Sequence, residues 1–305
     1  MADLSIKFLV TFSNPFILPS GIITEIPDHK KAIEAGAGGI TLKTITKEKR
    51  EGNPLPRLWK YEHGMLNSVG LRNPGIDEGI KQIEIFLKEN PNFPIIVSLF
   101  ATDVKEFAHL VEKIVPLSPP FIELNLSCPN TTDELGNALG MDEGAAEKVT
   151  KAVKMVSGKV TIIAKLSPNV SEISEVAKAC ESVGADAISA INTVGPGMII
   201  DIMKKKPVIG NKEGGVSGPA ILPIAIRCVY DIYEAVKIPI IGIGGVEKIE
   251  GAIQMFMAGA TLVGVGTATY TKGMKVYEEL KKDLSEYMEK NNLKSLQDFI
   301  GAAHN

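Results

Sequence analysis

Cysteine is scarce in this chain, and the few cysteines present are widely spaced. The 305 residues contain 3 cysteines, Cys128, Cys180 and Cys228. Disulfide-rich and iron–sulfur proteins need several cysteines, in clusters with short and regular spacing. The sequence therefore argues against a disulfide framework and against an iron–sulfur cluster held by this chain.

The chain also lacks a large charge imbalance and a long apolar run. Its formal net charge is -3 at pH 7, which gives no reason to expect a nucleic acid or an anionic membrane as the main partner. No apolar run approaches the ~20 residues of a membrane span. The start, MADLSIKFLVTFSNPF, has no basic leader and is too polar for a signal peptide. We expect a cytoplasmic protein that binds neither nucleic acid nor membrane.

What the sequence does contain is an ordinary globular composition, 45% apolar and 23% charged, with alternating β-type and helical patterns. The short apolar runs predict eight strands, at 17–21, 38–44, 94–100, 121–127, 160–166, 187–192, 239–244 and 262–267. Amphipathic segments between or after them predict helices, including 76–89, 104–117, 143–156, 173–184 and 276–290.

Eight strands that alternate with helices predict a (β/α)8 TIM barrel, with residues 1–305 as a single domain. An open, doubly wound parallel sheet is the alternative, because strand counts are least certain at sheet edges. Two stretches, 45–80 and 194–220, interrupt the alternation. Long ordered loops in a compact domain are usually functional, so we expect these to be excursions at the C-terminal face of the barrel.

Two lysines near strand ends give the strongest indication of a ligand. Lys43 is close to the end of 38–44, and Lys165 lies in 160–166. Chemistry in a barrel takes place at the carboxyl ends of the strands, and lysine is seldom buried without a partner. One such lysine is consistent with a structural ion pair. Two of them, together with nearby asparagines, favour a bound ligand.

The last two predicted strands end in glycine, a pattern that suits a phosphate. Gly244 and Gly245 follow one strand, and Gly266 precedes Thr267 at the end of the other. Backbone N–H groups at these strand ends commonly bind phosphate in barrels, and a side chain there would keep the phosphate away. Either cluster alone is more often a turn. Together, and with the glycine-rich 214–218, they indicate a phosphate-bearing ligand.

A lysine beside such a phosphate is compatible with flavin mononucleotide (FMN), where a cation near the pyrimidine end stabilises the reduced ring. It is equally compatible with a phosphosugar isomerase or lyase that forms a Schiff base on lysine. Four asparagines help to separate these readings, because amides supply both the donors and the acceptors that a planar heterocycle needs. They are Asn67, Asn125, Asn130 and Asn192.

Cys128 stands where the strand 121–127 passes into a loop, between Ser127 and Pro129. A thiol has an unperturbed pKa of roughly 8.5, and its thiolate is the reactive form. Because of its polar surroundings, we predict a proton-transfer role for Cys128. Cys180 and Cys228 lie in apolar helical segments, and we predict that both are packed and inert.

Linked motifs across 14–268 resemble the dihydroorotate dehydrogenases of pyrimidine biosynthesis. They are NPFILPSG, TLKTIT, EGNPLPRL, GMLNSVGLRNPG, NLSCPN, AKLSPN, INTVGPG, GGVSGPA, IIGIGG and VGTA, in the order and with the spacing of that family. The resemblance implies a TIM barrel that holds FMN and oxidises dihydroorotate to orotate. An FMN enzyme acting on another dihydropyrimidine, such as dihydrouracil, is the alternative within this architecture. A phosphosugar aldolase or isomerase is the alternative from another class.

Residue roles follow from the same resemblance, position by position. Cys128 matches the base that takes a proton from C5 of dihydroorotate, and Lys165 matches the lysine at the flavin pyrimidine. The positions that match substrate contacts are Lys43, Asn67, Val69, Gly70, Leu71, Asn125, Asn130, Asn192 and Thr193. Those that match cofactor contacts are Ser20, Lys43, Thr44, Asn125, Lys165, Gly218, Gly244, Gly245, Gly266 and Thr267.

The resemblance also implies partners. One soluble type is a homodimer that passes electrons to fumarate. Another pairs its catalytic chain with a subunit that carries FAD and a [2Fe–2S] cluster and uses NAD. The stretch 197–227 resembles the second type, and we expect a homodimer joined to such a subunit. The segment after Cys128, NTTDELGNALG, departs from the glycine-rich loop expected there, which leaves the electron acceptor open.

Overall fold

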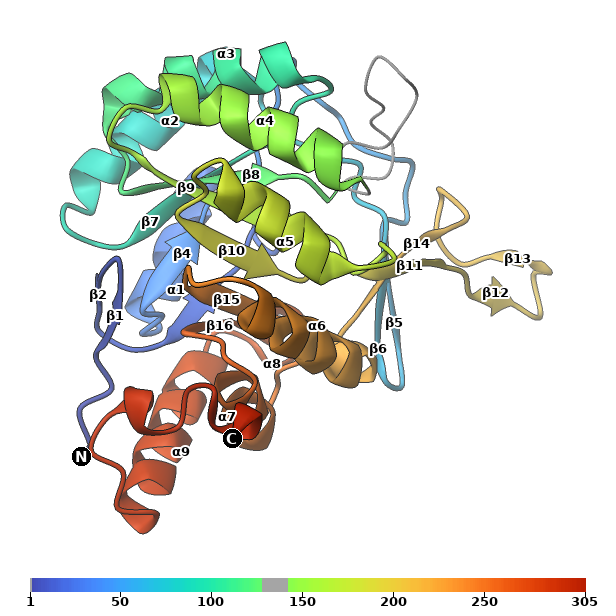
Figure 1. Ribbon diagram of the computed structural model, residues 1–305. Helices are drawn as coiled ribbons and strands as arrows, with labels where there is room; N and C mark the ends of the chain where they lie inside the picture. Colours follow the sequence, from blue (N-terminus) through green and yellow to red (C-terminus); the bar gives the residue numbers. More distant parts are fainter. Residues whose placement is uncertain (1, 128–141) are drawn as a thin grey trace.

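A closed barrel of eight parallel strands forms the centre of the molecule (Figure 1). The computed structural model describes residues 2–127 and 142–305. Around the barrel the order is β10-β15-β16-β3-β4-β7-β8-β9. Closure confirms the TIM barrel and excludes the open sheet. The strands are β3 (Phe16–Leu18), β4 (Gly39–Thr41), β7 (Ile95–Leu99), β8 (Phe121–Asn125), β9 (Thr161–Leu166), β10 (Ala187–Ala190), β15 (Ile240–Ile243) and β16 (Leu262–Gly264).

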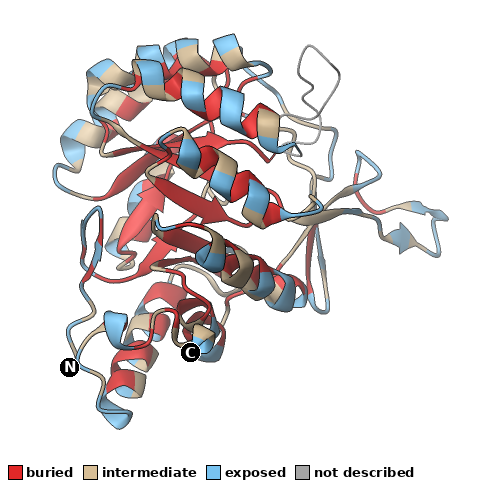
Figure 2. Cartoon of the chain, viewed as in Figure 1, coloured by how far each residue is buried: buried red, intermediate tan, exposed pale blue. Residues whose placement is uncertain are grey.

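The helices form an outer layer, so the barrel strands are buried on both faces (Figure 2). Strands covered in this way are rich in Val, Ile and Leu rather than alternating. The helices are α1 (Lys30–Glu34), α2 (Ile76–Glu89), α3 (Val104–Ile114), α4 (Glu143–Val156), α5 (Ile173–Ser182), α6 (Leu222–Ala235), α7 (Ile249–Met257), α8 (Thr267–Lys272) and α9 (Val276–Lys290). Short 3-10 turns are Ile26–His29, Val115–Leu117, Pro219–Ile221, Leu296–Asp298 and Ala302–His304.

Helix boundaries follow local chemistry. The side chains of Asp103 and Asp142 accept hydrogen bonds from backbone N–H groups at the starts of α3 and α4, which satisfies donors that have no partner within the helix. The predicted helix 104–117 ends earlier than expected, because α3 stops at Ile114 and a 3-10 turn containing Pro116 follows. Proline lacks the N–H that an α-helical continuation needs.

The barrel strands are shorter than the runs predicted from sequence. Strand β4 ends at Thr41 and β10 at Ala190, whereas the predicted runs extended to Thr44 and Asn192. The polar residues at these ends therefore lie in the loops just past the strands. This places them at the rim of the barrel, where a ligand has access.

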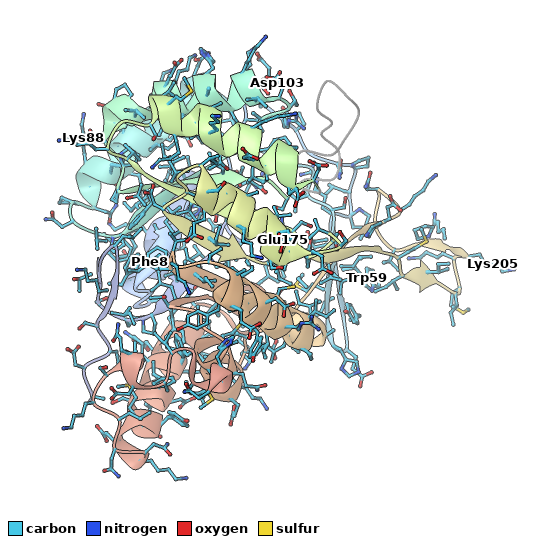
Figure 3. The ribbon with its side chains drawn as sticks, in the orientation of Figure 1. Phe8, Trp59, Lys88, Asp103, Glu175 and Lys205 are labelled. Atoms are coloured by element: carbon cyan, nitrogen blue, oxygen red, sulfur yellow. The ribbon has the colours of Figure 1, made fainter. Side chains whose placement is uncertain are left out.

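The two excursions pair with each other into a small antiparallel sheet, which the sequence did not predict. Its order is β11 (Val194–Gly197), β14 (Gly214–Ser217), β6 (Gly64–Asn67) and β5 (Leu58–Tyr61). From it projects an arm made of β12 (Ile200–Asp201) and β13 (Lys206–Pro207), with Lys205 at its end (Figure 3). A separate apolar cluster of Leu66, Val208 and Ile209 supports the base of the arm.

The opposite end of the barrel from this arm carries a hairpin, β1 (Ile6–Phe8) and β2 (Val10–Phe12) (Figure 1). The rings of Phe8 and Phe12 lie 6.1 and 6.0 Å from the ring of Phe121, the first residue of β8. Aromatic contacts at this spacing add to the burial energy. In the described part of the chain, no helix has the length and apolar character needed to cross a membrane.

Candidate active site

The two predicted lysines are both buried at the carboxyl ends of barrel strands. Lys43 and Lys165 are each 4% exposed. Burial, together with the nearby charges of Lys165 and Arg72, lowers the pKa of Lys43 from its ordinary value of 10.5 to about 8. Loss of hydration and like charges both disfavour the ammonium form. A bound anion would relieve this repulsion, so the site suits a negatively charged ligand.

A chain of hydrogen bonds connects Lys165 to the far side of the barrel. Lys165 Nζ donates to Ser20 Oγ at 3.0 Å, and Ser20 Oγ donates to Glu123 Oε1 at 3.1 Å. Ser98 Oγ reaches the same carboxylate oxygen at 3.0 Å and lies 2.9 Å from Thr44 Oγ1. The predicted cofactor residues Ser20, Thr44 and Lys165 are therefore brought together.

Neither Glu123 nor Ser98 was assigned to the site from the sequence. A signal for Glu123 was present, because Glu123 and Asn125 stand on the same face of the strand 121–127. Asn125 was assigned to the site, and side chains two residues apart on a strand share one face. A charged residue on that face of a fully buried strand was itself evidence for a polar interior.

Two predicted asparagines meet at the ends of β8 and β10 through a serine. Ser127 Oγ donates to Asn125 Oδ1 at 2.6 Å, and Asn192 Nδ2 donates to Ser127 Oγ. The Oδ1 atom of Asn192 in turn accepts from the backbone N–H of Thr193 at 2.8 Å. These bonds fix both amides, and such fixed amides can recognise a heterocycle by its donors and acceptors.

Asn67 in the small antiparallel sheet, and the turn that follows it, contain further predicted substrate residues. Asn67, at the end of β6, donates from Nδ2 to the backbone oxygen of Gly215 at 3.0 Å. Val69 accepts from the backbone N–H of Asn53 at 3.0 Å. Gly70 and Leu71 both have positive φ, 74° and 52°, so the chain turns sharply here. The backbone of this turn is thereby held in a defined shape.

The predicted phosphate site consists of turns in which glycine is required. Gly244 and Gly245 have φ of 141° and 77° and follow β15 directly. A Cβ on Gly245 would lie 2.7 Å from the backbone nitrogen of Leu222. In the described turns and caps, the N–H groups of Gly245, Gly266 and Thr267 donate to no backbone carbonyl. Unsatisfied N–H groups of this kind are available to an anion.

Gly218 lies next to this region. It has φ of 93° and precedes a 3-10 turn, and a Cβ on it would approach Thr267 Cγ2 at 3.3 Å. Thr267 Oγ1 donates to Ser217 Oγ at 2.9 Å. The small sheet and the end of β16 therefore meet at this point, which brings together Gly218 and Thr267, two of the predicted cofactor residues.

Cys128 and Asn130 lie outside the described residues, so their predicted roles rest on the sequence. The other two cysteines are buried in α5 and α6, which confirms the prediction that they are packed. Burial raises the pKa of both thiols, Cys180 and Cys228, to about 11. Neither is a reactive thiolate at neutral pH.

A family model described as dihydroorotate dehydrogenase matches residues 4–288. The chain belongs to the dihydroorotate dehydrogenase family. Among its curated relatives, a Pyrococcus horikoshii protein is 42% identical over 297 residues, covering 97% of this chain and 96% of its own. A Methanosarcina mazei protein is 40% identical over 293 residues, covering 95% and 92%. A Lachnoclostridium phytofermentans protein is 40% identical over 293 residues, covering 96% of each.

Each of these three relatives is named as the catalytic subunit of dihydroorotate dehydrogenase B (NAD(+)). The predicted enzyme, a dihydroorotate dehydrogenase of pyrimidine biosynthesis, is confirmed. Enzymes of this family are flavin-dependent. The barrel, the buried lysines and the glycine turns of this dihydroorotate dehydrogenase are thus parts of a flavoprotein.

Proposed function

We propose that this dihydroorotate dehydrogenase uses FMN, held at the carboxyl end of the barrel, and that Cys128 is the catalytic base. The observation that supports FMN best is the pairing of two buried lysines with the glycine turns after β15 and β16. A flavin mononucleotide carries an anionic phosphate at one end and a ring that gains negative charge on reduction. The N–H groups of the glycine turns therefore complement the phosphate, and the lysines complement the ring.

The residues fit the cofactor in two places. Gly245, Gly266 and Thr267 offer N–H groups to the phosphate, and the Cβ of any residue but glycine at 245 would displace the turn. Lys165 would contact the pyrimidine end of the ring. Gly218, Gly244, Ser20, Thr44 and Asn125 complete the proposed cofactor contacts. When bound, FMN accepts the hydride that leaves C6 of the substrate.

The substrate would be held by its carboxylate and its amide groups. Lys43 provides a buried positive charge. Asn67, Asn125, Asn130 and Asn192, with Thr193 and the backbone of Val69, Gly70 and Leu71, provide donors and acceptors around the ring. Cys128 removes the proton from C5 of dihydroorotate. A base that works at neutral pH needs a pKa near that pH, and a thiol, with an ordinary pKa of roughly 8.5, is within reach of this condition.

Replacement of Cys128 tests the proposal. Cys128→Ala should purify with bound FMN and bind orotate, but dihydroorotate should bleach its flavin ~10²–10⁴-fold more slowly under anaerobic conditions. Cys228→Ala is the matched control, since it removes a buried thiol on α6. Near wild-type bleaching of Cys128→Ala would remove Cys128 as the base. Bleaching by dihydrouracil, and not by dihydroorotate, would assign the site to the other dihydropyrimidine.

We further propose a homodimer joined to an electron-transfer subunit that carries FAD and a [2Fe–2S] cluster. The names of the relatives support this, because a catalytic subunit named for NAD(+) implies a second subunit. The chain itself has 3 cysteines in all, fewer than the four ligands of such a cluster. We also propose that 1–305 acts as one FMN-binding domain, since the main apolar core contains residues from Ile6 to Phe299.

A further inference from the structure

Glu123 is a buried carboxylate in the middle of the polar chain, and the proposed function gives it no role. It lies on β8 and is 1% exposed. A buried charge is costly even when it is hydrogen-bonded, and an apolar residue of similar size often makes a protein no less stable. Packing alone therefore does not account for a glutamate in the interior of this barrel.

The donors of this network all point toward Glu123. The Lys165 ammonium can only donate, so Ser20 accepts from it and gives its own hydrogen to Glu123 Oε1. Ser98 gives its hydrogen to the same oxygen. Thr44 must then be the donor in its 2.9 Å pair with Ser98. The carboxylate thus fixes the direction of every bond in the chain.

We propose that Glu123 is a positioning residue, which orients Lys165 through Ser20 and offsets its charge, and so sets the preference of the site between oxidised and reduced FMN. This inference rests on the proposed function, because Lys165, Ser20 and Thr44 are the proposed FMN contacts. Glu123 itself touches none of the reacting atoms. Its influence on the cofactor passes through Ser20 and through its electric field.

The physical reason is the negative charge that the flavin gains on reduction. Lys165 stabilises that charge, and a carboxylate one hydroxyl away opposes the stabilisation. A dehydrogenase must release electrons as well as accept them, so a cation without an opposing charge would hold the reduced cofactor too firmly. Glu123 keeps both oxidation states accessible while Ser20 keeps the ammonium in place.

Glu123→Gln is a clean test of the charge, because both serines donate to the same oxygen, Oε1. The amide carbonyl can accept both bonds, so the variant removes the charge and retains the network. We expect binding of oxidised FMN within threefold of wild type. The preference for reduced over oxidised FMN should rise about tenfold, which equals an upward shift of about 30 mV in the two-electron potential. Spectroelectrochemical titration measures the shift.

Asp186→Asn is the matched control. It also removes one carboxylate from the barrel region, but Asp186 pairs with Lys154 at 2.8 Å, just before the amino-terminal end of β10. The potential of this variant should equal that of wild type. An equal shift in both variants would mean that any lost negative charge has this effect, and it would overturn the role of Glu123.

Glu123→Asp tests the position of the carboxylate separately from its charge. It retains the carboxylate but is one methylene shorter, so it cannot reach both Ser20 and Ser98. We expect FMN binding weakened about tenfold, with the potential unchanged. If Glu123→Gln does not fold, Glu123→Asp provides the test, and an FMN affinity of Glu123→Asp equal to that of wild type would overturn the proposal. A wild-type potential in folded Glu123→Gln would overturn it as well.

Different results would contradict the proposed function and the role of Glu123. A wild-type protein that binds no FMN, or whose flavin dihydroorotate does not bleach, contradicts the proposed function itself. A wild-type protein that passes both tests, with variants that match it in FMN affinity and potential, contradicts only the role of Glu123.

Discussion

The charge on Lys43 favours binding of an anionic ligand but destabilises the folded protein. Lys43 is buried beside Lys165, and burial together with that neighbour and Arg72 lowers its pKa to about 8. An anionic ligand needs the charged form, whereas the fold disfavours it. Both consequences can be measured, one on the ligand and one on the free protein.

The first consequence is a pH dependence of orotate binding. Below pH 8 Lys43 is charged and attracts the carboxylate, and above its pKa of about 8 it is neutral. We therefore expect the Kd for orotate to rise about tenfold for each pH unit above 8. The measurement is a flavin absorbance titration in Cys128→Ala, so that the thiol does not titrate. Adding Lys43→Met to this variant should weaken orotate binding at all pH values, and a Kd of Cys128→Ala that does not change with pH would contradict this role.

The second consequence is that Lys43→Met stabilises the cofactor-free protein. The ordinary pKa of 10.5 is lowered to about 8 in the fold, and the difference corresponds to about 3 kcal/mol. This cost applies fully below pH 8 and is relieved as the pH rises to 10.5. We expect a gain of about 1–3 kcal/mol at pH 7 in urea unfolding, and a smaller gain at pH 10. A Lys43→Met variant less stable than wild type at pH 7 would show that the buried charge of Lys43 does not destabilise the fold.

At the scale of elements, the turns after β15 and β16 decide whether a phosphate can approach. Gly245 has φ of 77°, and a Cβ there would lie 2.7 Å from the backbone nitrogen of Leu222, the first residue of α6. We expect Gly245→Ala to weaken FMN binding by at least about tenfold, since the turn and its N–H group must move. Fluorescence quenching of free FMN on titration gives the Kd.

A control separates this effect from backbone strain alone. Gly158 also has positive φ, 59°, but a Cβ there meets nothing within 4 Å. Gly158→Ala should lower stability by about 1–2 kcal/mol and leave the FMN affinity unchanged. Equal FMN affinities in the two alanine variants would show that Gly245 lies outside the cofactor site.

The sequence predicted the elements formed by local patterns and missed those that depend on distant pairing. The eight barrel strands and the helices between them follow from periodicity within short windows. The small antiparallel sheet pairs Gly64–Asn67 with Gly214–Ser217. No short-range pattern indicates that these two segments pair with each other, so the stretches that contain them could be recognised only as functional excursions.

The same limit applies to the site. Lys43, Lys165 and the asparagines could be proposed as site residues because polar residues at strand ends stand out against apolar runs. Ser98 and Ser127 also follow apolar runs but were given no role, since serine is common in every context and their importance comes from partners on other strands. Sequence supplied the charged and amide groups, whereas the hydrogen bonds that orient them needed the folded barrel.

At the scale of the whole molecule, the path of electrons beyond the flavin is the remaining question. This chain has 3 cysteines in total, and 2 of them, Cys180 and Cys228, are buried in helices. A [2Fe–2S] cluster needs four such ligands, so the proposed cluster would belong to another subunit. The purified chain should therefore transfer electrons from dihydroorotate to an artificial dye and leave NAD unreduced.

Addition of an electron-transfer subunit with FAD and a [2Fe–2S] cluster should restore NAD reduction, because those centres link a two-electron donor to NAD. The measurement is NADH absorbance at 340 nm with dihydroorotate, with and without that subunit, and roughly tenfold or more separates the two rates if the subunit is required. Cys128→Ala in the complex is the control and should be slow with both acceptors. NAD or fumarate reduction by the isolated chain at the dye rate would contradict the two-subunit arrangement.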